Sequence, residues 1–482
     1  MKKIAFNIAV TGCLFLAAGC NKMLDIKDPV NSVTTREVFE TDEQAATALN
    51  GMYSYLISGG ELEVASGSLG TDLYSAGAIT IATGHSADEL YSPSLNGDYQ
   101  YYFETASKIT LSNPGYSDKI WRTAYKGIFN ANAIIEGVNA STSKELTAAF
   151  RKRLLGEALA VRAMSYFYLV NLFEKIPLAL TIDFNVLQRL PSANPADVYR
   201  QIISDLEEAS GYLSEGYDGN NVERIRINKW YVKAMLARVY LFAKDYEKAF
   251  RNASEVIGQT QLFQLENLDN VFTTGSREVI FQLKQTNISY ARGNATPEGY
   301  FFTGKFLTPL LMNAFETGDN RKTAWVSPIT ATPTRPAGFT PAKYKINFNN
   351  YEVGGFRSQY YVVMRLAEMF LVRAEANMLG GAANKNSAID DLNEIRKRAG
   401  LTVLPYTLTA QEVTAAIAQE RRIELFAEWG HRWLDLKRTN KASEVLFRIS
   451  YKQPWNQHQL LYPVPPEEIL WDNNLSQNEG YN

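Results

Sequence analysis

The pattern that most constrains the fold is a pair of short amphipathic segments between residues 227 and 257. Small and apolar side chains recur there every three or four residues, which places them on one face of an α-helix. They are Leu236, Ala237, Tyr240, Ala249, Ala253 and Val256. Lys244 and Asp245 separate the two segments, so the pattern predicts two helices joined by a tight turn. Tyr240 is expected to fill the groove between them.

This hairpin resembles the tetratricopeptide repeat, in which stacked helix pairs share their apolar faces. A single pair cannot bury its apolar face alone, so we expect the chain to contain others. The further helical candidates are 41–56, 120–138, 147–173, 195–213, 362–400 (a second hairpin broken at Gly380–Gly381) and 409–438, and one alternating segment, 278–283, predicts a short strand. The predicted fold class is mainly α, with tetratricopeptide-like helix pairs packed against a loop-rich part that holds a few short strands.

Two long stretches lack this periodicity and are predicted to be irregular. Residues 65–117 are rich in Gly, Ser and Tyr, and residues 284–360 are rich in Gly, Pro, Thr and Asn, with many aromatic side chains in both. Long irregular segments inside a compact domain are usually functional or flexible. These two stretches are therefore the predicted ligand-binding part of the chain.

The composition excludes several classes of function. The chain has 482 residues, of which 46% are apolar and 21% charged, and its net charge is −2 without any basic run. Nucleic-acid binding is therefore not expected. The two cysteines are Cys13 and Cys20, so the body of the chain has neither a disulfide nor a thiolate site, and only three histidines are present. We expect no metal site, no cofactor and no catalytic residues.

The N-terminus has the features of a secretory signal. Lys2 and Lys3 precede an apolar stretch too short for a transmembrane helix, and it ends in small residues before Cys20. This ending resembles the lipobox of bacterial lipoproteins, although Ala17 stands where Leu is usual. The resemblance implies a signal peptide over 1–19, an acylated Cys20, a tether over 20–40 and a single domain over 41–482. The alternative is plain secretion with a chance cysteine.

Short motifs spread along the chain resemble those of one protein family. They are Asn50–Tyr53, Gly156–Ala163, Met364–Glu368, Arg373–Ala376, Glu420–Leu425, Gly430–Arg438, Leu461–Pro465 and Gln477–Tyr481. Each motif is weak alone, but in this order behind a lipobox they resemble the SusD/RagB family of outer-membrane lipoproteins. Glu479 departs from the family pattern, which usually has Pro there.

The resemblance implies a function as well as a fold. Members of the SusD/RagB family carry four tetratricopeptide-like helix pairs and lie on the outer face of the outer membrane, held by an N-terminal acyl anchor. They cap a TonB-dependent, SusC-like transporter and deliver an oligosaccharide or a peptide to it without catalysis. The expected partners are therefore this transporter, a glycan or peptide ligand and membrane lipid.

A sugar offers an apolar ring face and an edge of hydroxyls, so its site needs flat aromatic rings with polar groups at their rims. The candidates from the two irregular stretches are Tyr91, Asn96, Asp98, Tyr99, Tyr101, Tyr102, Tyr300 and Trp325. Trp325 is preferred because most other tryptophans fall on predicted helices. The alternative is that these rings pack the loops onto the helices, as most aromatic side chains do.

Two other functions stay open at this stage. The charged run from Glu420 to Arg438 suggests acid–base chemistry, and hence a surface glycan hydrolase, although a helix laced with ion pairs explains it better. The repeat pattern also fits a periplasm-facing adaptor that binds other proteins.

Overall fold

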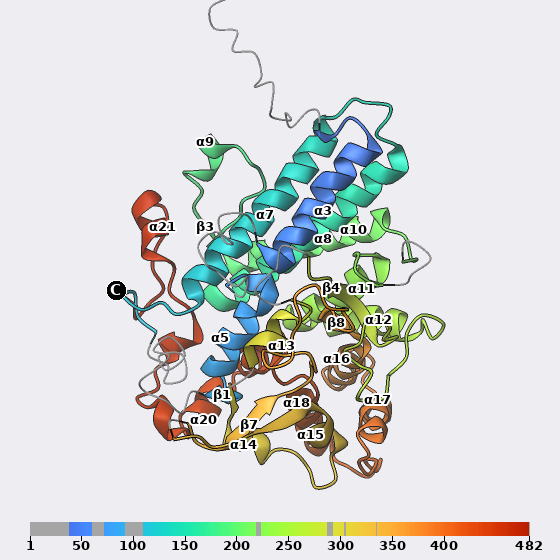
Figure 1. Cartoon of the computed structure of the whole chain (residues 1–482), viewed down its shortest axis with the longest axis vertical. Coiled ribbons are helices and arrows are strands. Elements are labelled where there is room, and N and C mark those ends of the chain that lie inside the picture. Colours follow the sequence, from blue (N-terminus) through green and yellow to red (C-terminus); the bar gives the residue numbers. More distant parts are fainter. Residues whose placement is uncertain are drawn as a thin grey trace, which may run out of the picture.

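Paired antiparallel helices form the larger part of the computed structural model, which describes residues 38–59, 72–91, 109–217, 223–286, 293–302, 305–333 and 335–481. The main helices are α3 (Asp42–Ser58), α7 (Ser117–Ala140), α8 (Ala148–Phe173), α10 (Pro195–Tyr212), α11 (Lys229–Phe242), α12 (Tyr246–Ile257), α16 (Leu366–Met378), α17 (Lys385–Arg398), α18 (Ala410–Glu424) and α19 (His431–Arg438). Successive helices pack side by side from α7 to α18, as in a repeat array (Figure 1).

The α11–α12 hairpin confirms the prediction made from its spacing. Asn228 begins α11 by accepting hydrogen bonds from two backbone amides, and Asp245 begins α12 by accepting one from Lys248. Between them Lys244 adopts a left-handed φ of 64°, which turns the chain. Ala237 is fully buried, and Tyr240 is buried with its hydroxyl 2.6 Å from a carboxylate of α10.

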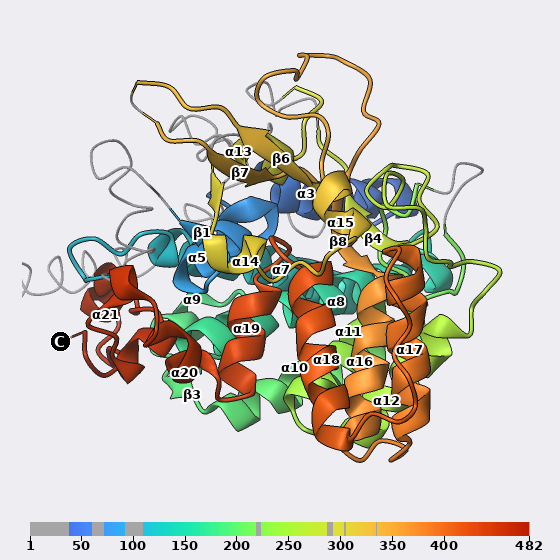
Figure 2. The same cartoon turned by 90° about the horizontal axis from the view of Figure 1, so that it is seen from below.

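Four two-stranded antiparallel pairs lie in the part of the chain that the structure describes. They are β1 (Leu90–Tyr91) with β5 (Phe306–Leu307), β2 (Ile176–Pro177) with β3 (Ser192–Ala193), β4 (Val279–Leu283) with β8 (Tyr361–Arg365), and β6 (Val326–Ile329) with β7 (Gly338–Pro341). Strand β4 confirms the strand predicted at 278–283. Figure 2 shows the β6–β7 hairpin on the side of the molecule opposite α12, α16 and α18.

The prediction of an irregular stretch over 65–117 is wrong for part of its described residues. A π-helical turn, η2 (Tyr74–Ala78), runs into α5 (Ile79–Ser86), and every residue of both is buried. A helix buried on all sides has no polar face, so it lacks the amphipathic periodicity on which the prediction relied.

Short helices also interrupt the second irregular stretch and the C-terminal region. The second irregular stretch contains α13 (Pro297–Phe302), α14 (Pro309–Met312) and α15 (Asn320–Trp325). The C-terminal region contains α20 (Ala442–Leu446), η3 (Ser450–Lys452), η4 (Gln457–Leu460) and α21 (Pro466–Trp471). Another short helix, α9 (Phe184–Leu187), lies between β2 and β3. None of the helices in the described ranges combines the length and the apolar run that crossing a bilayer requires.

The predicted single helix over 409–438 is in fact two helices. Helix α18 ends at Glu424 and α19 begins at His431, because Ala427, Trp429 and Gly430 have φ values of 52°, 45° and 74°. This turn places the Trp429 ring between those of Tyr168 and Tyr361, at centroid distances of 5.5 and 5.2 Å. Burial of this large ring therefore overrides the helical pattern.

A buried ion network joins β8 to the turn after α18. The Arg365 guanidinium lies 2.8 Å from the carboxylates of Glu278 and Glu428 and 2.6 Å from that of Glu424, and Lys343 also contacts Glu428. Burial alone would raise the pKa of Glu428, but Arg365 and Lys343 hold that pKa below its ordinary value. Breaking such a network would leave an uncompensated charge in the core.

Candidate ligand-binding site

Three aromatic rings of the second irregular stretch meet near the surface. The Tyr300 ring on α13 lies edge-to-face with Phe348 at 5.1 Å and with Tyr351 at 5.3 Å, and the latter two rings are 6.2 Å apart. Phe348 is 51% exposed, whereas the two tyrosines are half-buried. We call Tyr300, Phe348 and Tyr351 the aromatic trio. It offers ring surface to solvent on a base fixed by ring-to-ring packing.

Buried amides hold the loop that carries Phe348 and Tyr351. The Gln359 carboxamide oxygen accepts hydrogen bonds from the backbone amides of Lys345 and Ile346, at 2.6 and 3.0 Å. The Asn294 carboxamide accepts one from the Glu352 amide at 2.8 Å on the other side of the loop. Because both carboxamides are buried, replacing these bonds with water is costly, so the loop is held in one conformation.

Helix α13 is fixed at a second point, two residues before Tyr300. The Glu298 carboxyl is buried and accepts hydrogen bonds from the hydroxyls of Thr80 at 2.5 Å and Tyr361 at 2.9 Å. Burial raises the pKa of this carboxyl to about 8, so it is neutral at pH 7. The close approach of α13 to the loop also requires glycine at position 299, because a Cβ atom there would lie 2.3 Å from the Ile346 carbonyl oxygen.

A cavity of about 280 Å³ adjoins the trio, between α13, the β6–β7 hairpin and the loop that carries Phe348. Its lining includes Asn347 and Asn349, which flank Phe348, together with Thr330 and Arg335 from the hairpin. Arg335 donates one hydrogen bond to the Thr330 carbonyl at 3.3 Å, and its buried Nε has no hydrogen-bond partner among the described residues. The cavity therefore offers amide and guanidinium groups. The rings of the trio stand outside its described lining and adjoin it through their chain neighbours Gly299, Asn347 and Asn349. That combination suits hydroxyl-rich ligands.

Tyr91 belongs to the same loop-rich layer. It pairs with Phe306 in the β1–β5 ladder, and its ring lies edge-to-face with that of Phe306 at 5.5 Å. Phe306 also packs under Gly338, the first residue of β7. The structure therefore brings two predicted site residues, Tyr91 and Tyr300, to elements that adjoin the same hairpin, and their role in binding stays a prediction.

Trp325, the preferred ligand-binding ring of the second irregular stretch, is not a surface residue. It ends α15, its side chain is 0% exposed, and its indole nitrogen donates a hydrogen bond to the Leu268 carbonyl at 3.0 Å. Lys343 and Arg365 lie 4.7 and 5.7 Å from its ring. A ring enclosed in this way has no face available to a ligand, so Trp325 belongs to the core.

The remaining predicted positions cannot be placed. Asn96, Asp98, Tyr99, Tyr101 and Tyr102 lie outside the described residues, as does the predicted lipidation site Cys20. Sequence reasoning did not select Phe348, Tyr351 or Arg335. The run Asn347–Phe348–Asn349–Asn350 carried a usable signal, because asparagines favour turns and a turn presents the ring between them.

The charged run of α18 and α19 is structural, as its interpretation as an ion-paired helix predicted. Arg421 lies 2.7 Å from the Asp435 carboxylate, and Arg438 lies 2.6 Å from Glu375 on α16. Burial by itself raises the pKa of Asp435, but the two arginines hold that pKa well below its ordinary value. These carboxylates serve as partners for arginines that cross-link helices.

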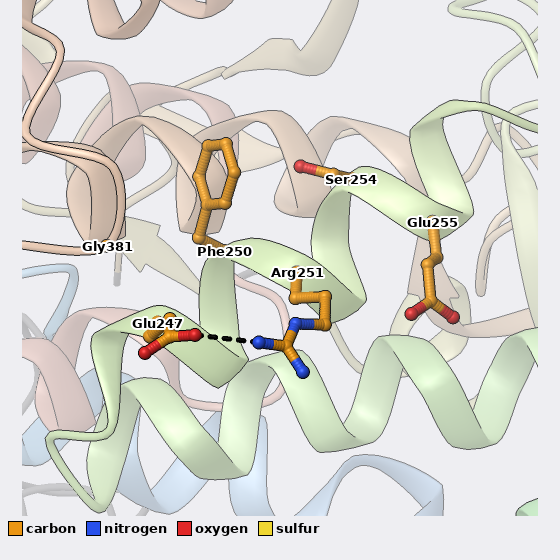
Figure 3. Close-up of a pocket in the computed structure, with 6 residues that line it drawn as sticks. All are labelled: Glu247, Phe250, Arg251, Ser254, Glu255 and Gly381. Carbon is orange, nitrogen blue, oxygen red and sulfur yellow. Dashed lines mark hydrogen bonds and ion pairs between the residues drawn. The ribbon is translucent and has the colours of Figure 1, made fainter.

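A depression of about 490 Å³ on α12 is a weaker candidate. Of its six lining residues, drawn in Figure 3, only Phe250 is aromatic. Its charged pair, Glu247 and Arg251, is joined by a 2.7 Å hydrogen bond and so is already satisfied. One half-buried ring beside a closed ion pair offers little to a sugar.

Comparison with known proteins finds two matching family models. The model described as "SusD family" matches residues 313–481, and the one described as "Starch-binding associating with outer membrane" matches residues 69–241. SusD-like protein P2 of Formosa agariphila is 27% identical over 76% of this chain and 81% of its own. Starch-binding protein SusD of Bacteroides thetaiotaomicron is 25% identical over 70% of this chain and 74% of its own.

Solved structures share the fold. A laminarin-binding SusD-like protein superposes with a TM-score of 0.75 at 23% identity, covering 92% of this chain and 100% of that one. A SusD superfamily protein from Bacteroides thetaiotaomicron has a TM-score of 0.74 at 21% identity, covering 91% and 99%. The predicted fold class, mainly α with tetratricopeptide-like helix packing, is confirmed.

Proposed function

Because the chain belongs to the SusD family, we propose that it is an outer-membrane surface protein that binds an oligosaccharide and passes it to a TonB-dependent transporter. The observation that carries the binding step is the aromatic trio beside the 280 Å³ cavity. Ring faces stack on the apolar side of a sugar, while Asn347, Asn349 and Arg335 are placed to bond its hydroxyls. One relative is named for starch binding and one structural neighbour for laminarin binding.

Binding without hydrolysis is the better interpretation of this site. Glycoside hydrolysis generally uses a pair of carboxylic acids on either side of the scissile bond. The described lining of the cavity contains asparagine, serine, threonine and arginine but no carboxylate. The described lining therefore lacks the carboxylic acid pair on which this mechanism generally depends, and its ionisable side chains are Tyr344 and Arg335.

Attachment and delivery complete the proposal. An acyl group on Cys20 holds the protein at the outer membrane through the tether predicted over 20–40, and the folded body caps a SusC-like transporter. The end of that predicted tether already belongs to the body, because Phe39 is buried in the core. Mass spectrometry of the N-terminal peptide tests the acylation, and protease treatment of intact cells tests the outward orientation. An unacylated Cys20, or a body protected from protease, would contradict this part.

Titration calorimetry tests the binding step with maltohexaose, laminarihexaose and a peptide mixture as separate ligands. Tyr300→Ala removes the ring that contacts both others, and we expect the affinity for the bound sugar to fall about tenfold, equivalent to ~1.4 kcal/mol. Phe447→Ala is the matched control, because that ring is 67% exposed and outside the site. Unchanged affinity in Tyr300→Ala would remove the trio from the site, and new reducing ends would indicate a hydrolase.

A further inference from the structure

A second concave site lies between α7, α9 and α21, away from the trio. It is a groove of about 600 Å³ whose floor is formed by Trp121, Tyr125 and Ile128 of α7. Helices α9 and α21 lie on the same side of the molecule, beside α7 (Figure 1). We call it the α7–α9–α21 groove. Its volume is within the range of ~300–1,000 Å³ typical of small-molecule sites.

Three rings line this groove with much of their surface in solvent. Phe184 on α9 is 73% exposed, Trp471 at the end of α21 is 72% exposed, and Phe129 on α7 is 39% exposed. Large rings are normally buried, so three exposed rings around one concavity are a departure that calls for a ligand. Sequence reasoning missed Trp471, because it stands in a C-terminal segment without a marked pattern.

Hydrogen bonds and an ion pair hold the floor and the walls of the groove in place. The Tyr125 hydroxyl donates a hydrogen bond to the Pro177 carbonyl at 2.8 Å, which fixes a ring of the floor. Arg122 of α7 lies 3.3 Å from Glu467 of α21 and ties that wall to the floor. The Asn474 carboxamide donates to the Arg189 carbonyl at 3.3 Å, which joins the segment after α21 to the end of α9. The three rings are therefore held around a preformed space.

Polar groups stand among the rings, and all the charged ones are acidic. The lining includes Gln188, Glu468 and Asp472, and it contains no lysine or arginine. Asp472 accepts hydrogen bonds from the backbone and side chain of Asn474, at 2.9 and 2.8 Å. Burial raises the pKa of Glu468 and Arg122 opposes that rise, so this carboxylate is poorly solvated. Such groups accept hydrogen bonds from hydroxyls, and two carboxylates in the lining disfavour anions although Lys126 lies 4.8 Å from the centre of the Phe129 ring.

We propose that the α7–α9–α21 groove is a second oligosaccharide site, selective for neutral glycans; this rests on the proposed function. Flat exposed rings suit the apolar ring face of a sugar, and the carboxylate and amide acceptors between them suit its hydroxyls. The polar acceptors recur among the rings of the groove, whereas the exposed aliphatic residues nearby in the chain, Leu180, Val186 and Leu470, are not part of its lining. Sulfated or uronic-acid glycans would meet Glu468 and Asp472 and be excluded.

Calorimetric stoichiometry separates the two sites, with maltohexaose and laminarihexaose as neutral probes and a hexagalacturonate as the anionic one. We expect two sites per chain for the neutral sugar that binds. The double variant Phe184→Ala/Trp471→Ala should lose the groove site and keep the trio site unchanged. Tyr300→Ala should weaken the trio site about tenfold and leave the groove site unchanged. The triple variant should show only the weakened trio site. Phe447→Ala is the control for loss of an exposed ring, and thermal unfolding verifies that each variant folds.

Each outcome bears on a different claim. A single site that is weakened in Tyr300→Ala and unaffected in the double variant overturns the groove site but leaves the proposed function standing. Equal binding of hexagalacturonate to the groove overturns its selectivity. A double variant that keeps both sugar sites but no longer co-purifies with the transporter identifies a protein-docking surface and overturns the inference. No binding of any glycan overturns the proposed function and this inference with it.

Discussion

The buried carboxyl of Glu298 gives the sharpest test of how the Tyr300 helix is held. The change is Glu298→Gln, which keeps the shape of the side chain but removes its ionisation. In the folded chain this carboxyl stays protonated up to a pKa of about 8, whereas in the unfolded chain it ionises near its ordinary value of 4.5. A raised pKa in the folded state contributes stability below pH 4.5, and that stability is lost as the pH rises toward 8.

The size of the effect follows from the difference between the pKa values of Glu298 in the folded and the unfolded chain. It spans roughly 3.5 pH units, and each unit is worth about 1.4 kcal/mol of unfolding free energy. Wild type should therefore lose up to ~5 kcal/mol through Glu298 between pH 4.5 and 8, and the glutamine variant should not. Burial also raises the pKa of Glu89 to about 8. Because Glu89 is present in both proteins, its contribution to the unfolding free energy cancels in the comparison. Relative to wild type, Glu298→Gln should thus become steadily more stable as the pH rises.

Urea unfolding followed by tryptophan fluorescence at pH 4, 5, 6, 7 and 8 measures this difference. Glu428→Gln is the matched control of opposite sign, because Arg365 and Lys343 hold the pKa of that buried carboxyl below its ordinary value. It should destabilise the protein more at pH 7 than at pH 4. Sugar affinity should be retained in Glu298→Gln at pH 7, since the helix stays in place. A Glu298→Gln difference that is constant from pH 5 to pH 8 would refute the reasoning.

Three further predictions concern the frame and the site. Trp325→Ala should lower the unfolding free energy by ~3–5 kcal/mol, measured by urea denaturation, because it empties a core position; an unchanged midpoint would show that the ring is not packed there. Gly299→Ala forces a Cβ against the Ile346 carbonyl and should weaken sugar binding in calorimetry, and wild-type affinity would contradict the described contact. Arg365→Met removes the cation that Glu278, Glu424 and Glu428 share, so these buried carboxylates are one positive charge short. The change should cost ~3–5 kcal/mol at pH 7, and less at pH 4, in the same urea assay; equal losses at both pH values would show that charge is not the cause.

The repeat scaffold was predictable because its helices are amphipathic. The alanines and Tyr240 of the α11–α12 hairpin lie on the buried side that their spacing indicates. The pattern fails where burial is complete or where a single large ring decides the backbone. Residues 74–86 are helical without a polar face, and Trp429 bends the chain between α18 and α19.

The site was predictable only in part, because ring exposure depends on tertiary packing. Tyr300 and Trp325 were alike in sequence as aromatic residues of an irregular stretch, yet one contacts two partner rings near the surface and the other lies in the core beside Lys343. Trp471 stands in a segment without a marked pattern, yet it is among the most exposed rings of the described chain. Composition identifies the regions that carry rings, but only packing decides which faces remain available.

The most direct measurement is a diffraction experiment on crystals soaked with the oligosaccharide that calorimetry identifies. The account predicts sugar density against the rings of Tyr300, Phe348 and Tyr351, with hydroxyls bonded to Arg335 or to the neighbouring asparagines. Sugar bound at saturating concentration elsewhere, with these three rings bare, would contradict the central claim.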